Sequence, residues 1–225
     1  MLLKTTDISV IIRMKKDKPS PNQQHPDHPQ GNPRNGVSGL SSYRDKRDFS
    51  QTPEPRPRLQ TPSERNPYLV FAVQKHAASQ LHYDIRLEVR GALKSWAVPK
   101  GPSMNPNDKR LAIETENHPY AYKDFEGKIP EGNYGAGDVI VWDKGWYEPI
   151  GPGAGPNDRM VRGLRRGAIR FILHGKKLKG GFSLVRFRPP DQWLLVKRED
   201  MYARDEEPVV EDDSSVISRK RLPDQ

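Results

Sequence analysis

The residues best suited to chemistry lie at positions 74–86, which read QKHAASQLHYDIR. Successive side chains of a β-strand point to opposite faces, so an extended segment would put His82, Asp84 and Arg86 on one face. Hydrophobic residues fill the alternate positions, as expected of a face turned to a core: Tyr83, Ile85, Leu87 and Val89. The polar row predicts a functional site, although a polar edge strand would share the pattern.

A second histidine, His76, precedes His82 by six residues. A bend over 77–80 would therefore bring both imidazoles to one point, with Asp84 beside them. Two histidines and one carboxylate suit divalent first-row metals and leave positions open for water and substrate. Arg86 would then place a fixed cation next to the metal, an arrangement that binds a phosphate oxygen. Surface histidines on a polar strand are the alternative.

The pair His82-x-Asp84 also matches the iron-binding pattern of non-haem Fe(II)/2-oxoglutarate oxygenases. That class of enzyme needs a distant third histidine and an arginine for the co-substrate acid. His174 and Arg186 are the candidates for these parts. This alternative stays open, but it leaves His76, His118 and the basic charge of the chain unexplained.

Two further segments hold polar side chains among turn residues, and such loops commonly carry function. The segment KGPSMNPNDKRLAIETENHPYAY contributes Lys100, Arg110, Glu116, His118 and Tyr122. The segment YRDKRDFSQTPEP contributes Arg47, Asp48 and Glu54. Any one of these residues, taken alone, would be an ordinary surface residue.

The elements that must position these side chains are short runs of β-branched and aromatic residues, separated by Gly, Pro and Asn. The runs are YLVFAVQ, HYDIRLEV, ALKSWAV, RLAIETE, DVIVWD, AIRFILHG, FSLVRFR and WLLVK. Strands of this length and spacing predict an antiparallel barrel or sandwich. Arg90 and Gly91, between two of the runs, predict a hairpin turn.

The segments on either side of this pattern lack apolar periodicity. Residues 1–42 are rich in Pro, Asn, Gln, Gly and Ser from position 15 onward, and residues 203–225 are acidic and then basic. Such sequences bury too little apolar surface to offset the entropy of ordering. We therefore expect a disordered leader over 1–42, one domain over 43–202 and a mobile charged tail over 203–225.

Charge and composition narrow the classes of function. The net charge is +9, and residues 43–202 hold 28 Lys and Arg against 19 Asp and Glu, so the basic excess lies in the expected domain. That distribution favours a polyanionic partner such as nucleic acid. The absence of cysteine excludes disulfides, thiolate metal sites and cysteine nucleophiles. Without an apolar run of about 18 residues or a signal peptide, no membrane association is expected, and we expect a cytoplasmic protein.

Two long stretches resemble a known family. They are QKHAASQLHYDIRLEVRGALKSWAVPKGPS and KRLAIETENHPYAYKDFEGKIPEGNYGAGDVIVWDKG, supported by the later HGKKLKGGFSLVR and WLLVKRED. Together they closely resemble the 3′-phosphoesterase module of bacterial DNA ligase D and its free-standing archaeal and bacterial relatives. The resemblance runs from about 43 to 200. It implies a mainly β fold, a compact antiparallel β-barrel with short helical turns.

The resemblance also implies roles for individual residues. Manganese would be bound by His76, His82 and Asp84, although the ligand types alone would also fit zinc, iron or cobalt. The residues expected in catalysis are Arg86, Glu116, His118 and Tyr122. Contacts to the substrate and its phosphate are expected from Arg86, His118, Gln74, Lys100, Arg110, Arg47, Asp48 and Glu54.

The activity implied is two-step processing of nucleic-acid 3′ ends for end-joining repair. A 3′-terminal ribonucleoside is removed to leave a 3′-phosphate, which is then removed to give a 3′-hydroxyl. The sequence contains no KxDG nucleotidyl-transfer motif, so we expect a stand-alone enzyme whose partner ligase and polymerase are separate proteins. A non-catalytic module that binds DNA ends is a further alternative.

Overall fold

The computed structural model describes residues 39–60, 68–205 and 212–222. The chain divides into Met1–Gly31, which lies outside the described residues, and Asn32–Gln225, which contains every element below. Most of the leader expected over 1–42 therefore lies outside the described residues. The first element, α1 (Ser41–Asp45), begins close to the expected start of the domain at Tyr43.

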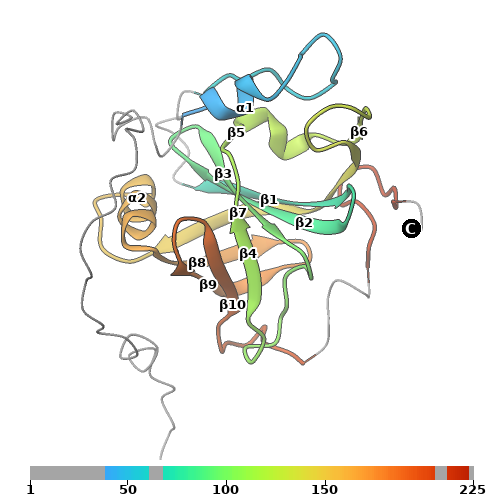
Figure 1. Ribbon diagram of the computed structural model, residues 1–225. Helices are drawn as coiled ribbons and strands as arrows, with labels where there is room; N and C mark the ends of the chain where they lie inside the picture. The colour runs from blue at the N-terminus through green and yellow to red at the C-terminus, as the bar shows by residue number, and fades with distance from the viewer. Residues whose placement is uncertain (1–38, 61–67, 206–211, 223–225) are drawn as a thin grey trace, which may run out of the picture. The chain divides into compact units, whose positions relative to one another are not determined.

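Eight antiparallel strands form a closed barrel in the order β1-β2-β3-β4-β10-β9-β8-β7, with β7 pairing back to β1 (Figure 1). The strands are β1 (Leu69–Ala77), β2 (Leu81–Val89), β3 (Ala92–Val98), β4 (Arg110–Glu114), β7 (Gly137–Ile150), β8 (Ala168–Gly175), β9 (Lys179–Arg188) and β10 (Gln192–Lys197). Each contains most or all of one of the runs predicted from the sequence. The predicted β-barrel is confirmed.

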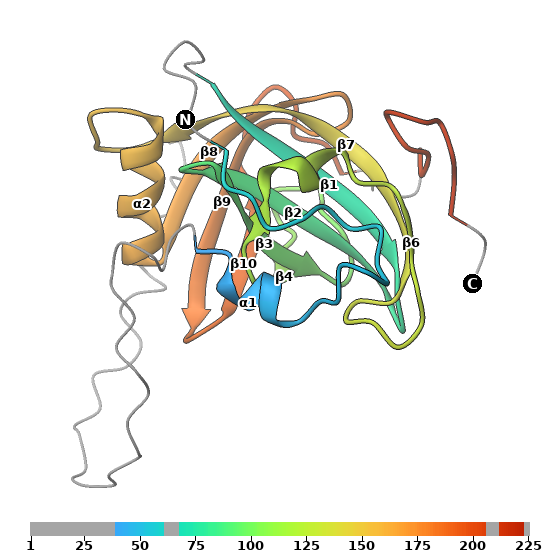
Figure 2. The ribbon, with the colours of Figure 1, turned by 90° about the horizontal axis from the view of Figure 1, so that it is seen from above.

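Two short strands lie off the barrel path and were not predicted. β5 (His118–Pro119) pairs with β3, and β6 (Gly127–Ile129) pairs with β7. Between them runs the 3-10 helix η2 (Tyr120–Asp124). Figures 1 and 2 show α1 and the β5–η2 segment on the same side of β1, β2 and β3.

The longest helix of the described residues, α2 (Pro156–Arg166), lies at one end of the barrel beside β8 and β9 (Figure 2). Pro156 starts it, and Gly167 ends it in the left-handed conformation that favours glycine. Its apolar side is buried with the barrel core through Met160, Val161 and Leu164. None of the helices in the described residues is long and apolar enough to span a bilayer.

Within the part of the chain that the structure describes, buried apolar side chains gather in two clusters. The larger fills the barrel and includes Tyr83, Ile85, Leu87 and Val89 of β2, which confirms the predicted core-facing row. The smaller includes Tyr43, Leu93, Tyr122, Phe125, Ile129 and Val139. It combines residues of α1 and η2 with residues of the strands. The alternate row of β2, which starts at His82, therefore faces away from the barrel core. It lies beneath the α1 segment and the β5–η2 segment, which together we call the cover.

The hairpin turn predicted at Arg90 and Gly91 joins β2 to β3. Both residues have positive φ angles, of 51° and 80°, as a two-residue hairpin turn of type I′ requires. A Cβ atom on Gly91 would lie 1.9 Å from the carbonyl oxygen of Gln60. Only glycine fits at position 91, because the backbone of Gln60 passes so close to the turn.

Part of the segment expected to form a mobile tail packs on the barrel. The backbone N–H of Val216 donates to the carbonyl of Val141 (2.9 Å), and the Ser215 hydroxyl bonds to Glu126. Ser215 is fully buried and Val216 nearly so. Backbone and polar contacts, rather than an apolar pattern, hold residues 212–222 in place.

Candidate functional site

The β1–β2 hairpin builds the first part of the site. In its register His76 lies opposite His82 and Gln74 lies opposite Asp84. Side chains of directly paired residues on one face of a sheet are neighbours. The pairing therefore brings His76, His82 and Asp84 together, as the sequence predicted from the bend over 77–80. One ligand atom from each lies within 4.8 Å of the other two.

Backbone carbonyls fix both imidazoles with a lone pair toward Asp84. His76 Nε2 lies 2.9 Å from the carbonyl oxygen of Gly135, and His82 Nδ1 lies 2.9 Å from that of Gln80. Because a carbonyl only accepts, each of these nitrogens carries the proton. The other nitrogens, His76 Nδ1 and His82 Nε2, lie 3.7 and 3.9 Å from Asp84 Oδ2. Metal-binding histidines are commonly held in this way.

The third member, Asp84, is a buried carboxylate that stays ionised. Burial raises its pKa, but the opposing contacts around it, first among them the charge of the Arg86 guanidinium, outweigh burial, so the net pKa lies well below its usual range. Arg86 Nη2 donates to Asp84 Oδ2 at 3.0 Å. In the described residues this is the one group of three or more side chains able to hold a metal ion. Two imidazole nitrogens and an ionised carboxylate oxygen fit a first-row divalent ion.

Arg86 joins this group to the rest of the site. Its Nε donates to Gln74 Oε1 (2.5 Å) and its Nη1 to the Ser95 hydroxyl (3.0 Å). The guanidinium also lies over the Tyr122 ring, 4.6 Å from its centroid. Gln74 is fixed in turn by donating to the carbonyls of Tyr122 and Phe125. Arg86 is thus buried and held rigidly, with its charge beside Asp84.

His118 completes the inner site. Its Nδ1 lies 2.8 Å from Arg86 Nη1, 3.1 Å from Ser95 Oγ and 3.0 Å from the Glu116 carbonyl oxygen. The guanidinium can only donate and makes the shortest contact, so we assign Nδ1 as acceptor and Nε2 as the protonated nitrogen. Burial, followed by the charge of Arg86, holds the pKa of His118 well below 6.5. The imidazole is therefore neutral at neutral pH.

Buried ion pairs tie the α1 segment to this inner site. Arg47 donates to Glu54 Oε1 and to Glu116 Oε1, each at 2.9 Å. The Tyr122 hydroxyl donates to the same Glu54 oxygen at 2.8 Å. Lys46 reaches the other oxygen of Glu116 at 2.6 Å. The cover over Arg86 and His118 is therefore polar and charged on its inner side.

Three predicted site residues are not joined to this network by a described contact. Asp48 is exposed, and its carboxylate accepts from Ser50 and Gln51 of its own turn. Lys100 is exposed just after β3. Arg110 pairs with Asp108 and is two residues from the core residue Ala112, so it points toward the barrel side of β4. Their predicted substrate contacts stay predictions.

The ligand set of the oxygenase alternative is not assembled, and that interpretation is wrong in its geometry. His174 stacks on Trp146, with ring centroids 3.5 Å apart, and its Nε2 lies 2.8 Å from Glu148. Arg186 lies over the Trp193 ring. The barrel places both away from the pair His82 and Asp84, because β8 and β9 do not border β2.

Sequence reasoning missed several residues of the site. Ser95 contacts both Arg86 and His118, and it lies opposite Arg86 in the β2–β3 register. A small polar residue in the run ALKSWAV, whose other polar residue is Lys94, was the available signal. Lys46 and Tyr134 were also missed; the Lys46 amine lies 4.2 Å from the Tyr134 ring centroid. Nothing in their local sequence marks them.

Comparison with known proteins identifies the family. Residues 74–186 match the family described as DNA Ligase D 3′-phosphoesterase domain. The multifunctional non-homologous end joining protein LigD of Pseudomonas aeruginosa is 51% identical over 168 residues, which cover 73% of this chain and 19% of that protein. LigD of Mycolicibacterium smegmatis is 39% identical over 184 residues, covering 80% and 24%.

The non-homologous end joining DNA repair protein LigD of Mycobacterium tuberculosis is 42% identical over 156 residues, covering 69% of this chain and 19% of that protein. The chain thus spans about a fifth to a quarter of the length of these relatives. The matched region includes β2, β3 and His118, around which the site is built. The chain belongs to the DNA ligase D 3′-phosphoesterase domain family.

Proposed function

We propose that the chain is a manganese-dependent phosphoesterase that processes the 3′ ends of nucleic-acid strands for end-joining repair. It would remove a 3′-terminal ribonucleoside to leave a 3′-phosphate and then remove that phosphate. One observation carries the proposal: lone pairs of His76 and His82 and the ionised Asp84 face one point beside the buried Arg86. A separate DNA ligase and polymerase are the proposed partners, since both would use the 3′-hydroxyl produced.

His76 Nδ1, His82 Nε2 and an Asp84 oxygen are the atoms that would hold the metal ion. When bound, the ion would supply a Lewis acid that offsets negative charge on the phosphate in the transition state. Arg86 would bind a phosphate oxygen through a guanidinium already oriented by Gln74 and Ser95. Such prior orientation avoids reorganisation during the reaction.

His118 would act through the protonated Nε2 that its contact with Arg86 leaves available. That N–H would donate a hydrogen bond to a phosphate oxygen or a proton to the leaving oxygen, since imidazole serves in both ways. Arg47, Glu54, Glu116 and Tyr122 would act as positioning residues, because their side-chain hydrogen bonds join them to one another rather than to the three residues that would hold the metal. Their loss would move His118 and the cover above it.

A labelled primer–template tests the proposal. The primer is labelled at its 5′ end, terminates in one ribonucleotide and is incubated with manganese or with excess EDTA. We expect a product shortened by the ribonucleoside that carries first a 3′-phosphate and then a 3′-hydroxyl, in manganese only. Turnover in EDTA would contradict the role of the metal. Binding without turnover in any divalent metal would favour the DNA-end-binding alternative.

A further inference from the structure

One end of the barrel carries six exposed arginines that the proposed chemistry does not use. Three lie on α2, two on the adjoining hairpin of β8 and β9, and one on the β2–β3 turn. We call them the arginine surface: Arg162, Arg165, Arg166, Arg170, Arg188 and Arg90. Figures 1 and 2 both place α2 beside β8 and β9.

Short connections hold these arginines at the same end. The backbone N–H of Arg186, two residues before Arg188, donates to the carbonyl of Gly167 at the end of α2 (2.8 Å). The backbone N–H of Arg90 donates to the Asn157 side chain in the first turn of α2 (2.6 Å). The surface is therefore continuous across three parts of the fold.

Little negative charge opposes this surface. Arg162 pairs with Asp158 at 3.0 Å, one turn earlier on the same helix. The charge of Asp158 also interacts with Arg90, without a close ion pair. Across 39–60, 68–205 and 212–222, the remaining four arginines form no ion pair. The helix dipole accounts for basic residues such as Arg165 and Arg166 in a last turn, by about 0.3–1 kcal/mol each. It does not account for Arg170 and Arg188 on strands.

We propose that the arginine surface binds the sugar–phosphate backbone of the duplex part of the substrate, on the side away from the reacting 3′ end. This proposal rests on the proposed function for its choice of nucleic acid. Unpaired like charges repel one another, and a row of phosphates would offset that repulsion. All six residues are arginine, whose planar guanidinium matches phosphate oxygens in pairs.

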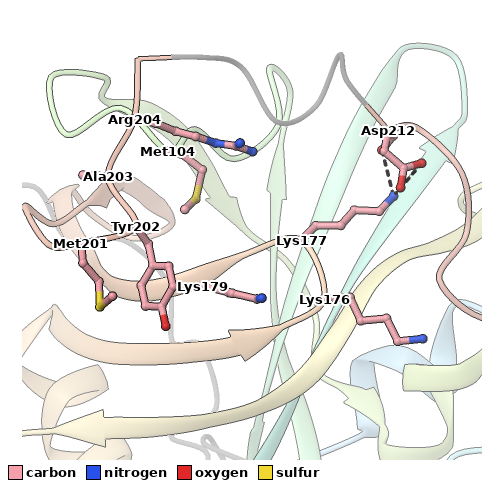
Figure 3. Close-up of a pocket in the computed structure, with 9 residues that line it drawn as sticks. All are labelled: Met104, Lys176, Lys177, Lys179, Met201, Tyr202, Ala203, Arg204 and Asp212. Atoms are coloured by element: carbon pink, nitrogen blue, oxygen red, sulfur yellow. Dashed lines mark hydrogen bonds and ion pairs between the residues drawn. The ribbon is translucent and has the colours of Figure 1, made fainter.

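A second basic place, at the β8–β9 turn, is less suited to this role. Lys176, Lys177 and Lys179 line a pocket of about 470 Å³ there (Figure 3). The Lys177 amine donates to the carbonyls of Asp212 and Ser214 at 2.8 and 2.6 Å, and the Lys176 amine donates to that of Val216. Two of the three amines already hold the C-terminal segment.

The fold sets the distance from the reacting phosphate to the surface. Arg90 follows Arg86 by four residues along β2, which at about 3.3 Å per residue is roughly 13 Å. Successive phosphates of one strand are about 3.4 Å apart along the axis. Contacts would therefore start about four nucleotides from the 3′ end. α2, with 11 residues, is roughly 16 Å long. It would extend the contacts along the strand by about another four to five nucleotides.

The test compares two triple variants. One replaces Arg165, Arg166 and Arg170 with Ser. The control replaces Lys109, Arg198 and Lys220, which are exposed elsewhere, with Ser, so both variants lose the same charge. Binding is measured by fluorescence anisotropy on a duplex of about 20 base pairs with a 3′-hydroxyl end, long enough to pass the surface. A 3′-phosphorylated dinucleotide, too short to reach it, reports turnover.

We expect the arginine variant to bind the duplex about tenfold more weakly near 0.1 M salt and to lower the salt slope by about 2–3. Its turnover of the dinucleotide should equal that of the unaltered protein. Equal duplex affinity in the arginine variant would overturn the proposal, as would an equal loss in the control variant. If the unaltered protein shows no turnover but the arginine variant still binds the duplex more weakly, the proposed function is wrong. The proposed role of the arginine surface then still holds.

Discussion

His82 tests the metal-binding site at the scale of single residues. It offers one of three ligand atoms for the proposed metal. Loss of a residue that only hydrogen-bonds to a metal ligand costs about 10–100-fold in affinity, so His82→Ala should weaken manganese binding by more than about 100-fold. Calorimetric titration of the metal-free protein measures this directly. His174→Ala is the matched control, because its ring contacts Trp146 and Glu148 instead. Unchanged manganese affinity in His82→Ala would disprove the ligand set.

Arg86 should separate metal binding from chemistry. Arg86→Ala leaves the three metal ligands in place, and we expect manganese to bind while turnover falls by about 10²–10³-fold, as on removal of one transition-state donor. Single-turnover rates at saturating manganese measure the loss. Arg86→Lys should not restore the rate, since one amine cannot reach Gln74, Ser95 and Asp84 together. Full activity in either variant would make Arg86 structural only.

The lowered pKa of His118 predicts a dependence of stability on pH. Between that folded value and the ordinary 6.5, the unfolded chain binds a proton that the folded chain does not. Stability should therefore fall as the pH falls below about 6.5, by up to about 1.4 kcal/mol per pH unit from this group. Urea unfolding of metal-free protein from pH 7 to 5 measures the slope. His118→Asn, which keeps an acceptor for Arg86, should lose that part of the slope.

At the scale of elements, Asp143 holds the β8–β9 turn. Its carboxylate is buried and accepts the backbone N–H groups of Lys144, Lys176, Lys177 and Leu178 at 2.8–3.1 Å. Asp143→Ala would leave those donors without acceptors, so we expect about 2–4 kcal/mol less stability in urea unfolding. Asp124→Ala, which breaks exposed ion pairs, should cost less than about 1 kcal/mol. Equal losses in the two variants would contradict the role of Asp143.

The strands could be predicted because each is a short β-branched run, and alternation along β2 separated its core row from its site row. α2 could not be predicted with the same reasoning. Its apolar residues Met160, Val161 and Leu164 are few, and Gly and Pro dominate the preceding 151–156. Residues 212–222 were missed for another reason. Backbone carbonyls, which carry no side-chain signal, make their contacts with Lys176 and Lys177.

At the scale of the whole molecule, the site lies on the outside of a closed barrel. The three proposed metal ligands come from β1 and β2, and Arg47 and Glu54 belong to the same network from the α1 side. Sequence spacing could predict that these three side chains come together, because they share one hairpin. It could not show the contact of Arg47 with Glu116, since the two residues are 69 positions apart. Long-range pairs of this kind follow from the fold alone.

Because the hairpin register exists only in the folded chain, manganese should stabilise the whole protein. A ligand at about 100 times its dissociation constant adds about 2.7 kcal/mol when it binds only the folded state. For a domain of this size that is a rise of roughly 5–11 °C in Tm. Thermal unfolding in manganese and in EDTA measures it without reference to activity. Asp84→Ala should abolish the rise, while His174→Ala should keep it. A rise that persists in Asp84→Ala would place the ion somewhere other than the β1–β2 hairpin.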